Sequence, residues 1–254
     1  MSLTRQQTRE LCYAGMRTHV VSWAIMNVAV INLIYAGASG LFRLAFHKVA
    51  IVNPDMLNES YWKVQMGLSI LQVSIIAFLF LFGYRLLKSP KAVMLPVKSM
   101  KEQTQLSGST VLQLLEIWAV ILVGIKLVDI VLTDIYRNFV ADLFSLFDLA
   151  DADAMEMFRS MYNNTHAFKY VGMLVAIALG IFITGVLLHD RTLKVLSAIL
   201  VALFILTATF LQMGTYTIMN RAVAIVWSSV MLQLLQTFGM FGFSFYLYRN
   251  YRGI

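Results

Sequence analysis

Residues 111–136 of this chain read VLQLLEIWAVILVGIKLVDIVLTDIY. The stretch is apolar and long enough to cross a bilayer, which takes about 20 residues in a helix that rises roughly 1.5 Å per residue. It nevertheless contains Glu116, Lys126, Asp129 and Asp134. Ionisable side chains within a span are costly, tend to face other helices or water, and mark functional candidates by default. The stretch therefore predicts a membrane-spanning fold and supplies the first candidate site.

The whole chain has the composition of an integral membrane protein. Hydrophobic residues make up 59% of its 254 residues and charged residues 13%, whereas a soluble domain has about 25% charged residues. Basic cytoplasmic loops explain the net charge of +7 more simply than nucleic-acid binding does. The single cysteine, Cys12, excludes an internal disulfide and a cysteine-rich metal site.

Hydropathy predicts an all-α, polytopic membrane helix bundle in a single integral membrane domain, residues 1–254. Six transmembrane helices are expected at about residues 20–46, 67–87, 111–134, 168–188, 194–213 and 221–248. The first has features of a signal peptide, including Ala36-Gly37-Ala38, and we expect it to be retained as a span. Residues 137–166 alternate carboxylates with apolar side chains, which predicts an amphipathic extracytoplasmic segment between helices 3 and 4.

The distribution of charge predicts the orientation. Lys and Arg are enriched near the N-terminus and in the loop that contains Lys88 and Lys98, whereas carboxylates such as Asp148 and Asp151 gather in residues 137–166. Cytoplasmic loops are enriched in Lys and Arg. Because six spans place both termini on one side, we predict an N-in, C-in protein of a bacterial inner membrane.

The charged residues of the third span define a candidate ion or proton path. At about 100° per residue, Glu116, Lys126 and Asp129 fall in one sector of a helix. Lys126 and Asp129 are three residues apart and close enough to pair. They either line a path or form a structural pair near the membrane surface, toward which a lysine extends its ammonium group. We favour the structural pair.

Two other spans carry stripes of amide and hydroxyl side chains. The stripes are Gln65, Ser69 and Gln72 at the second span, and Ser229, Gln233 and Gln236 on the sixth. Side-chain amides hydrogen-bond across helices in lipid, with a contribution of about 0.6–2 kcal/mol each. We expect both stripes to hold helices together rather than to bind a substrate. If they converge, they surround one polar centre.

Small residues recur at every fourth position of the fourth span, at Gly172, Ala176 and Gly180. Such a ridge lets another helix approach closely, which is the usual basis of helix packing in membranes. The partner helix belongs either to this chain or to another subunit.

The sequence contains no catalytic motif, and we expect no cofactor and no metal site. Two function classes remain. The favoured one is a non-enzymatic membrane subunit that packs inside a larger secretion, transport or respiratory complex, beside other membrane subunits or further copies of itself. The alternative is a self-contained channel or transporter for an ion or small solute, which uses the charged residues of the third span.

Overall fold

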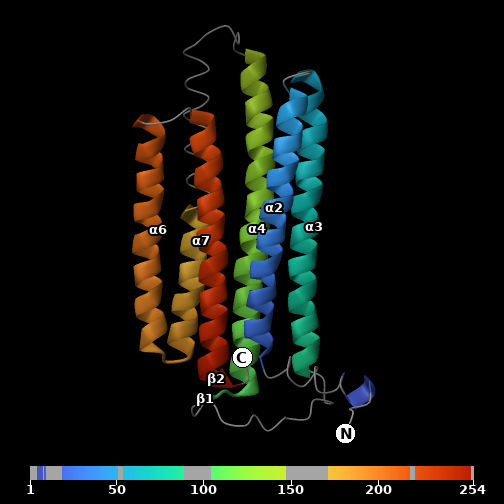
Figure 1. Cartoon of the computed structure of the whole chain (residues 1–254). Coiled ribbons are helices and arrows are strands. Elements are labelled where there is room, and N and C mark those ends of the chain that lie inside the picture. The colour runs from blue at the N-terminus through green and yellow to red at the C-terminus, as the bar shows by residue number, and fades with distance from the viewer. Residues whose placement is uncertain are drawn as a thin grey trace. The chain divides into compact units, whose positions relative to one another are not determined.

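The computed structural model describes residues 5–7, 9, 19–50, 54–88, 104–146, 171–217 and 221–252. The described residues are almost entirely helical, which confirms the prediction of an all-α fold (Figure 1). The helices are α2 (Val20–Ala50), α3 (Pro54–Lys88), α4 (Gly108–Leu146), an apolar helix at Val171–Leu187, α6 (Arg191–Thr217) and α7 (Arg221–Asn250). The two-residue strands β1 (Thr104–Gln105) and β2 (Tyr251–Arg252) pair in parallel.

Proline marks both limits of α3. Pro54 occupies its first position, where the missing N–H is not needed for an intrahelical hydrogen bond. Pro90 follows two residues after the last helical residue, Lys88, and proline disfavours a helical conformation in the residue before it. The sequence therefore sets the length of α3 at both ends.

α4 is longer than the predicted third span. It continues to Leu146, beyond the expected end at residue 134. The first part of the predicted extracytoplasmic segment is thus a continuation of this helix. Residues 147–166 of that segment lie outside the described residues.

The chain divides into two compact units, and the boundary falls within α4 and α7. The first unit comprises Met1–Val123 and Leu234–Ile254, and the second unit comprises Gly124–Gln233. The prediction of a single membrane domain over residues 1–254 stays a prediction.

The first unit is a bundle of α2, α3, the first part of α4 and the last part of α7. α2 and α3 lie side by side and run in opposite directions (Figure 1). Aromatic pairs join the helices: the ring centroids of Trp23 and Phe82 are 5.8 Å apart, and those of Trp118 and Phe243 are 5.1 Å apart. The buried apolar core further includes Ile25, Val28, Ile76, Phe80, Leu114, Leu122, Met240 and Leu247.

The described part of the second unit contains an antiparallel hairpin formed by the helix Val171–Leu187 and α6. The Ser197 hydroxyl of α6 donates a buried hydrogen bond of 2.8 Å to the Ala178 carbonyl of the other helix. Ala178 also belongs to a buried cluster with Leu174, one turn earlier in its helix, and Phe204 of α6.

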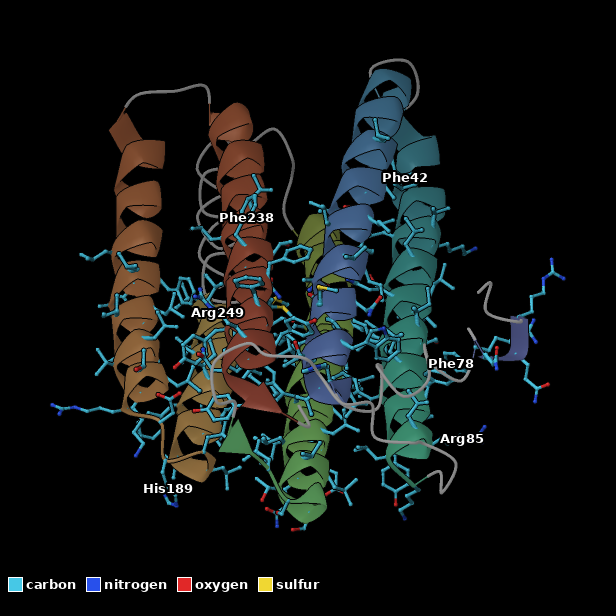
Figure 2. The ribbon with its side chains drawn as sticks, turned by 60° about the horizontal axis from the view of Figure 1, so that its bottom comes forward. Phe42, Phe78, Arg85, His189, Phe238 and Arg249 are labelled. Atoms are coloured by element: carbon cyan, nitrogen blue, oxygen red, sulfur yellow. The ribbon has the colours of Figure 1, made fainter. Side chains whose placement is uncertain are left out.

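The turn of this hairpin is fixed by its backbone. His189 has a left-handed φ of 53°, and Figure 2 shows it at the end of the hairpin. Its amide donates to the Val186 carbonyl, and the Asp190 amide donates to the Gly185 carbonyl, which is the pattern of a Schellman helix end. The Asp190 carboxylate then accepts the Thr192 amide at 2.8 Å and caps α6.

Two segments of the described residues are long and apolar enough to cross a membrane, Val20–Ser39 and Lys63–Lys88. The buried core helix of a soluble protein meets the same criterion, and so does a signal sequence near the N-terminus. The most apolar window is 44% buried within the molecule in Val20–Ser39 and 22% buried in Lys63–Lys88. The six-span bundle stays a prediction.

Candidate functional site

The amide and hydroxyl stripe of α3 meets polar side chains of α2. Gln72 Nε2 donates to Asn32 Oδ1 at 2.8 Å. Gln65 Nε2 donates to the Tyr35 hydroxyl at 3.0 Å, and the same hydroxyl is 2.9 Å from Ser69 Oγ. All three residues of the predicted stripe are therefore used in hydrogen bonds between two neighbouring helices.

Asn32 extends this set of contacts to α7. Its Nδ2 points to the thioether of Met240 at 3.9 Å, a weak acceptor. Asn32 and Gln72 are only 8% and 3% exposed. Because a buried amide is costly unless it is hydrogen-bonded, the pair strongly favours this arrangement of α2 against α3.

Gln65 has one unused hydrogen-bonding atom. The residue is 9% exposed, and its Oε1 is buried without a hydrogen-bond partner among the described residues. A buried acceptor in this condition costs about 1–3 kcal/mol. Gln65 therefore contributes less to the interface than Gln72.

A pair of serines joins α2 to α7. The Ser22 hydroxyl donates to the Ser244 carbonyl, and the Ser244 hydroxyl donates to the Ser22 carbonyl, both at 2.7 Å. Ser22 and Asn32 are about 15 Å apart along α2, and Ile25 and Val28 are buried between them. Among the described residues, the Ser22–Ser244 contact and the Asn32–Gln72 contact are thus separate links between helices.

The charged residues of α4 fall in different units. Glu116 belongs to the first unit and is exposed, although the preceding residue, Leu115, is buried. Lys126 and Asp129 belong to the second unit and are half-buried. Their assignment to an ion path or to a structural pair stays a prediction.

The ridge predicted on the fourth span lies partly on the surface. Gly172 is exposed and an added Cβ there has no neighbour within 4 Å, Ala176 is half-buried and Gly180 is buried. The tightest approach to α6 is instead at Gly185, where an added Cβ would lie 2.9 Å from Leu193 Cβ. Gly185 was missed because it falls outside the four-residue period.

The stripe of the sixth span is described only in part. Gln236 is buried in the first unit, whereas the side chains of Ser229 and Gln233 lie outside the described residues. Sequence reasoning also missed Asn32 and Tyr35, although both are polar residues within an apolar span and lie one helical turn apart. Over the part of the chain that the structure describes, no group of three His, Cys, Asp or Glu side chains is arranged to hold a metal ion.

Comparisons of the chain with protein families, with characterised proteins and with solved structures give no match. The functional interpretation therefore rests on the residues and their geometry.

Proposed function

We propose that this chain is an integral membrane protein with six spans and cytoplasmic termini. Its role is that of a non-enzymatic subunit that packs inside a larger membrane assembly. The polar links between its helices stabilise the subunit, and its apolar outer faces contact lipid and neighbouring subunits.

The observation that carries this proposal is the polarity of α3, which is reversed relative to a soluble helix. Its amide side chains, including Gln72, are buried, whereas large apolar side chains point outward. Leu71, Phe78 and Leu81 are 56%, 66% and 64% exposed. Soluble monomers seldom expose a contiguous apolar patch larger than a few hundred Å². Such a surface is favourable in hydrocarbon.

The positions of the chain ends support an even number of crossings. His19 precedes α2 and its ring centroid lies 4.4 Å from that of Tyr248 near the end of α7. The start of α2 and the end of α7 are therefore at the same end of the first unit, as expected if both termini lie on one side of the membrane.

The use of the polar side chains supports a packing role. The amides and hydroxyls of α2, α3 and α7 bond to one another across helices, and an apolar section of core separates them into links. A transport path would require polar groups that continue through the bundle and remain available to a solute. On α2, the buried Ile25 and Val28 lie between the two polar contacts, which favours a packing role.

The proposal is tested by purifying the tagged full-length chain in a mild detergent. We expect it to co-purify with a membrane protein partner in fixed stoichiometry, or as a defined homo-oligomer, and proteoliposomes of the chain alone to carry no ion or solute flux. A monodisperse monomer that conducts an ion or transports a solute would instead establish the channel or transporter alternative.

A second test uses the charged pair of α4. If Lys126 and Asp129 form a structural pair, Lys126→Met alone destabilises the chain, because it leaves the charge of Asp129 uncompensated. The double variant Lys126→Met with Asp129→Leu leaves no uncompensated charge, so it restores stability and keeps assembly intact. If the charges serve a path, the double variant folds but is inactive, and Glu116→Gln also impairs activity. Thermal stability, assembly and ion or solute flux are measured together for each variant.

A further inference from the structure

The outer surface of α3 changes abruptly from apolar to cationic. Phe78 and Leu81 are 66% and 64% exposed, and the next exposed residues toward the end of the helix are Arg85 and Lys88. Figure 2 shows Arg85 nearer than Phe78 to this end of α3. The change takes place within about one helical turn, or roughly 5 Å.

α7 shows the same change of surface. Phe238 and Phe245 are 68% and 64% exposed, Tyr248 is 51% exposed, and the exposed Arg249 follows in the last turn. An apolar surface, an amphipathic aromatic side chain and a cation thus occur in this order along the helix.

Contacts between the helices place the two changes at one end of the first unit. An added Cβ on Gly83 of α3 would lie 3.1 Å from Val20 at the start of α2. The preceding residue, His19, has its ring 4.4 Å from that of Tyr248. Arg85 lies two residues after Gly83, and Arg249 lies one residue after Tyr248. Both arginines are therefore near the same end of the bundle.

The aromatic residues at this end have the character of a membrane interface. The Lys88 ammonium lies 4.3 Å from the centroid of the Tyr84 ring, in cation–π contact. Tyrosine is enriched where a helix passes from hydrocarbon to headgroups, and Lys and Arg are enriched just beyond that level on the cytoplasmic side. Tyr84 and Tyr248 fulfil this role on α3 and α7.

We propose that this end of the first unit lies at the headgroup level of the bilayer and binds the phosphate groups of anionic phospholipids through Arg85, Lys88 and Arg249. The inference rests on the proposed membrane location. Among the described residues of α3, α4 and α7, Glu116 is an exposed carboxylate near this end, because the preceding residue, Leu115, lies against Gly83. The exposed side chains described for these three helices at this end thus carry more positive than negative charge, and a positive surface attracts an anionic leaflet.

The test measures the association of spin-labelled phosphatidylglycerol and phosphatidylcholine with the full-length protein in vesicles of both lipids. We expect a preference for phosphatidylglycerol that falls about fivefold for each cation removed at low salt, in R85Q, K88Q and R249Q. The charge-retaining variant R85K/R249K is the matched control and keeps the preference. Because the interaction is electrostatic, 1 M salt should weaken it.

Three results would overturn the inference. The first is an equal association of both lipids with the wild-type protein. The second is displacement of phosphatidylglycerol by millimolar inorganic phosphate, which would indicate a site for free phosphate. The third is a loss of stability in R85Q/K88Q/R249Q with no change in lipid preference, which would mean that the cations only stabilise helix C-termini.

Cysteine labelling separates this inference from the proposed function. In a Cys12→Ser background, Lys88→Cys should react with a membrane-impermeant maleimide added to the side of the membrane that it faces, and Leu81→Cys should be protected. If both react equally fast from that side, the membrane location itself is wrong. If Leu81→Cys is protected and the lipids still bind equally, only the preference for anionic lipid is overturned.

Discussion

The two helical hairpins of this chain hold their helices together by different contacts. In the first unit, α2 and α3 are joined by side-chain hydrogen bonds such as Gln72 to Asn32. In the second unit, the helix Val171–Leu187 and α6 approach closely at Gly185, beside the hydrogen bond from Ser197 to Ala178. Helices in an apolar medium associate by both routes, because burial from water no longer drives them together.

The close approach at Gly185 follows from the turn of the second hairpin. A tight turn between Leu187 and Arg191 closes the second hairpin, and its Schellman and capping hydrogen bonds hold the two helix ends close together. Only a residue without a side chain fits at position 185. Along α2 and α3, polar side chains supply the specificity. The hairpins should therefore respond differently to substitution.

The largest effect is expected for Gly185→Ala in the second hairpin. The new Cβ would lie 2.9 Å from Leu193 Cβ and 3.0 Å from the Lys194 amide nitrogen. Since a backbone atom cannot move aside cheaply, we expect a loss of about 3 kcal/mol or more in the free energy of unfolding, measured by denaturant titration in mixed micelles.

Gly172→Ala is the matched control on the same helix. No atom lies within 4 Å of its added Cβ, and alanine is a better helix former than glycine by about 1 kcal/mol. The control should be neutral or stabilising. Equal effects of the two substitutions would remove the close approach as the basis of this hairpin.

The next largest effect is expected in the first hairpin, for Gln72→Leu. The variant leaves Asn32 buried without its donor, which should cost about 2 kcal/mol. The double variant with Asn32→Leu should recover part of this loss, with a coupling energy of roughly 0.6–1.7 kcal/mol in a double-mutant cycle. The exposed Gln113 of α4 provides the control, and Gln113→Leu should have almost no effect.

Gln65→Leu sharpens the same comparison. It removes the bond to Tyr35 but also removes the buried Oε1 that lacks a partner among the described residues. Its cost should therefore be smaller than that of Gln72→Leu. A larger cost would mean that Gln65 Oε1 binds water or another donor in the membrane.

The sequence was sufficient to predict that the chain is helical, but it did not predict the ends of the helices: α3 begins at Pro54 rather than at residue 67, and α4 continues to Leu146. Long apolar runs, ended by proline in the case of α3, specify helices almost independently of their neighbours. The stripe of Gln65, Ser69 and Gln72 was also recognisable, because a helical period places the three residues on one face.

The partners of that stripe were not predictable in the same way. A helical period defines a face, but which neighbour meets that face depends on the tertiary arrangement. Asn32 and Tyr35 stood out in the sequence as polar residues within an apolar span, yet nothing local paired them with α3. Gly185 was likewise hidden, because its requirement for a missing side chain arises from a turn that brings α6 against it.

A smaller effect is expected for Gly83→Ala in α3. Its Cβ would lie 3.1 Å from Val20 Cγ2 and 3.5 Å from the Leu115 methyl groups. These are side-chain atoms that can shift by a few tenths of an ångström, so we expect a loss of about 1 kcal/mol. Gly67→Ala on the same helix meets no atom within 4 Å and should not destabilise. If Gly83→Ala costs as much as Gly185→Ala, then α3 also depends on backbone approach and the contrast between the hairpins fails.

The smallest effect is expected for Ser197→Ala, which removes the side-chain hydrogen bond between the helices of the second hairpin. The Ala178 carbonyl that accepts it lies within a helix and keeps its backbone partner, so the variant should lose only about 0.5–1 kcal/mol. Ser74→Ala is the control, because the exposed Ser74 hydroxyl donates to the Ile70 carbonyl of its own helix and links nothing. A loss above about 2 kcal/mol for Ser197→Ala would place the second hairpin in the hydrogen-bonded class of α2 and α3. A loss no larger than that of Ser74→Ala would leave the approach at Gly185 as the contact on which this hairpin depends.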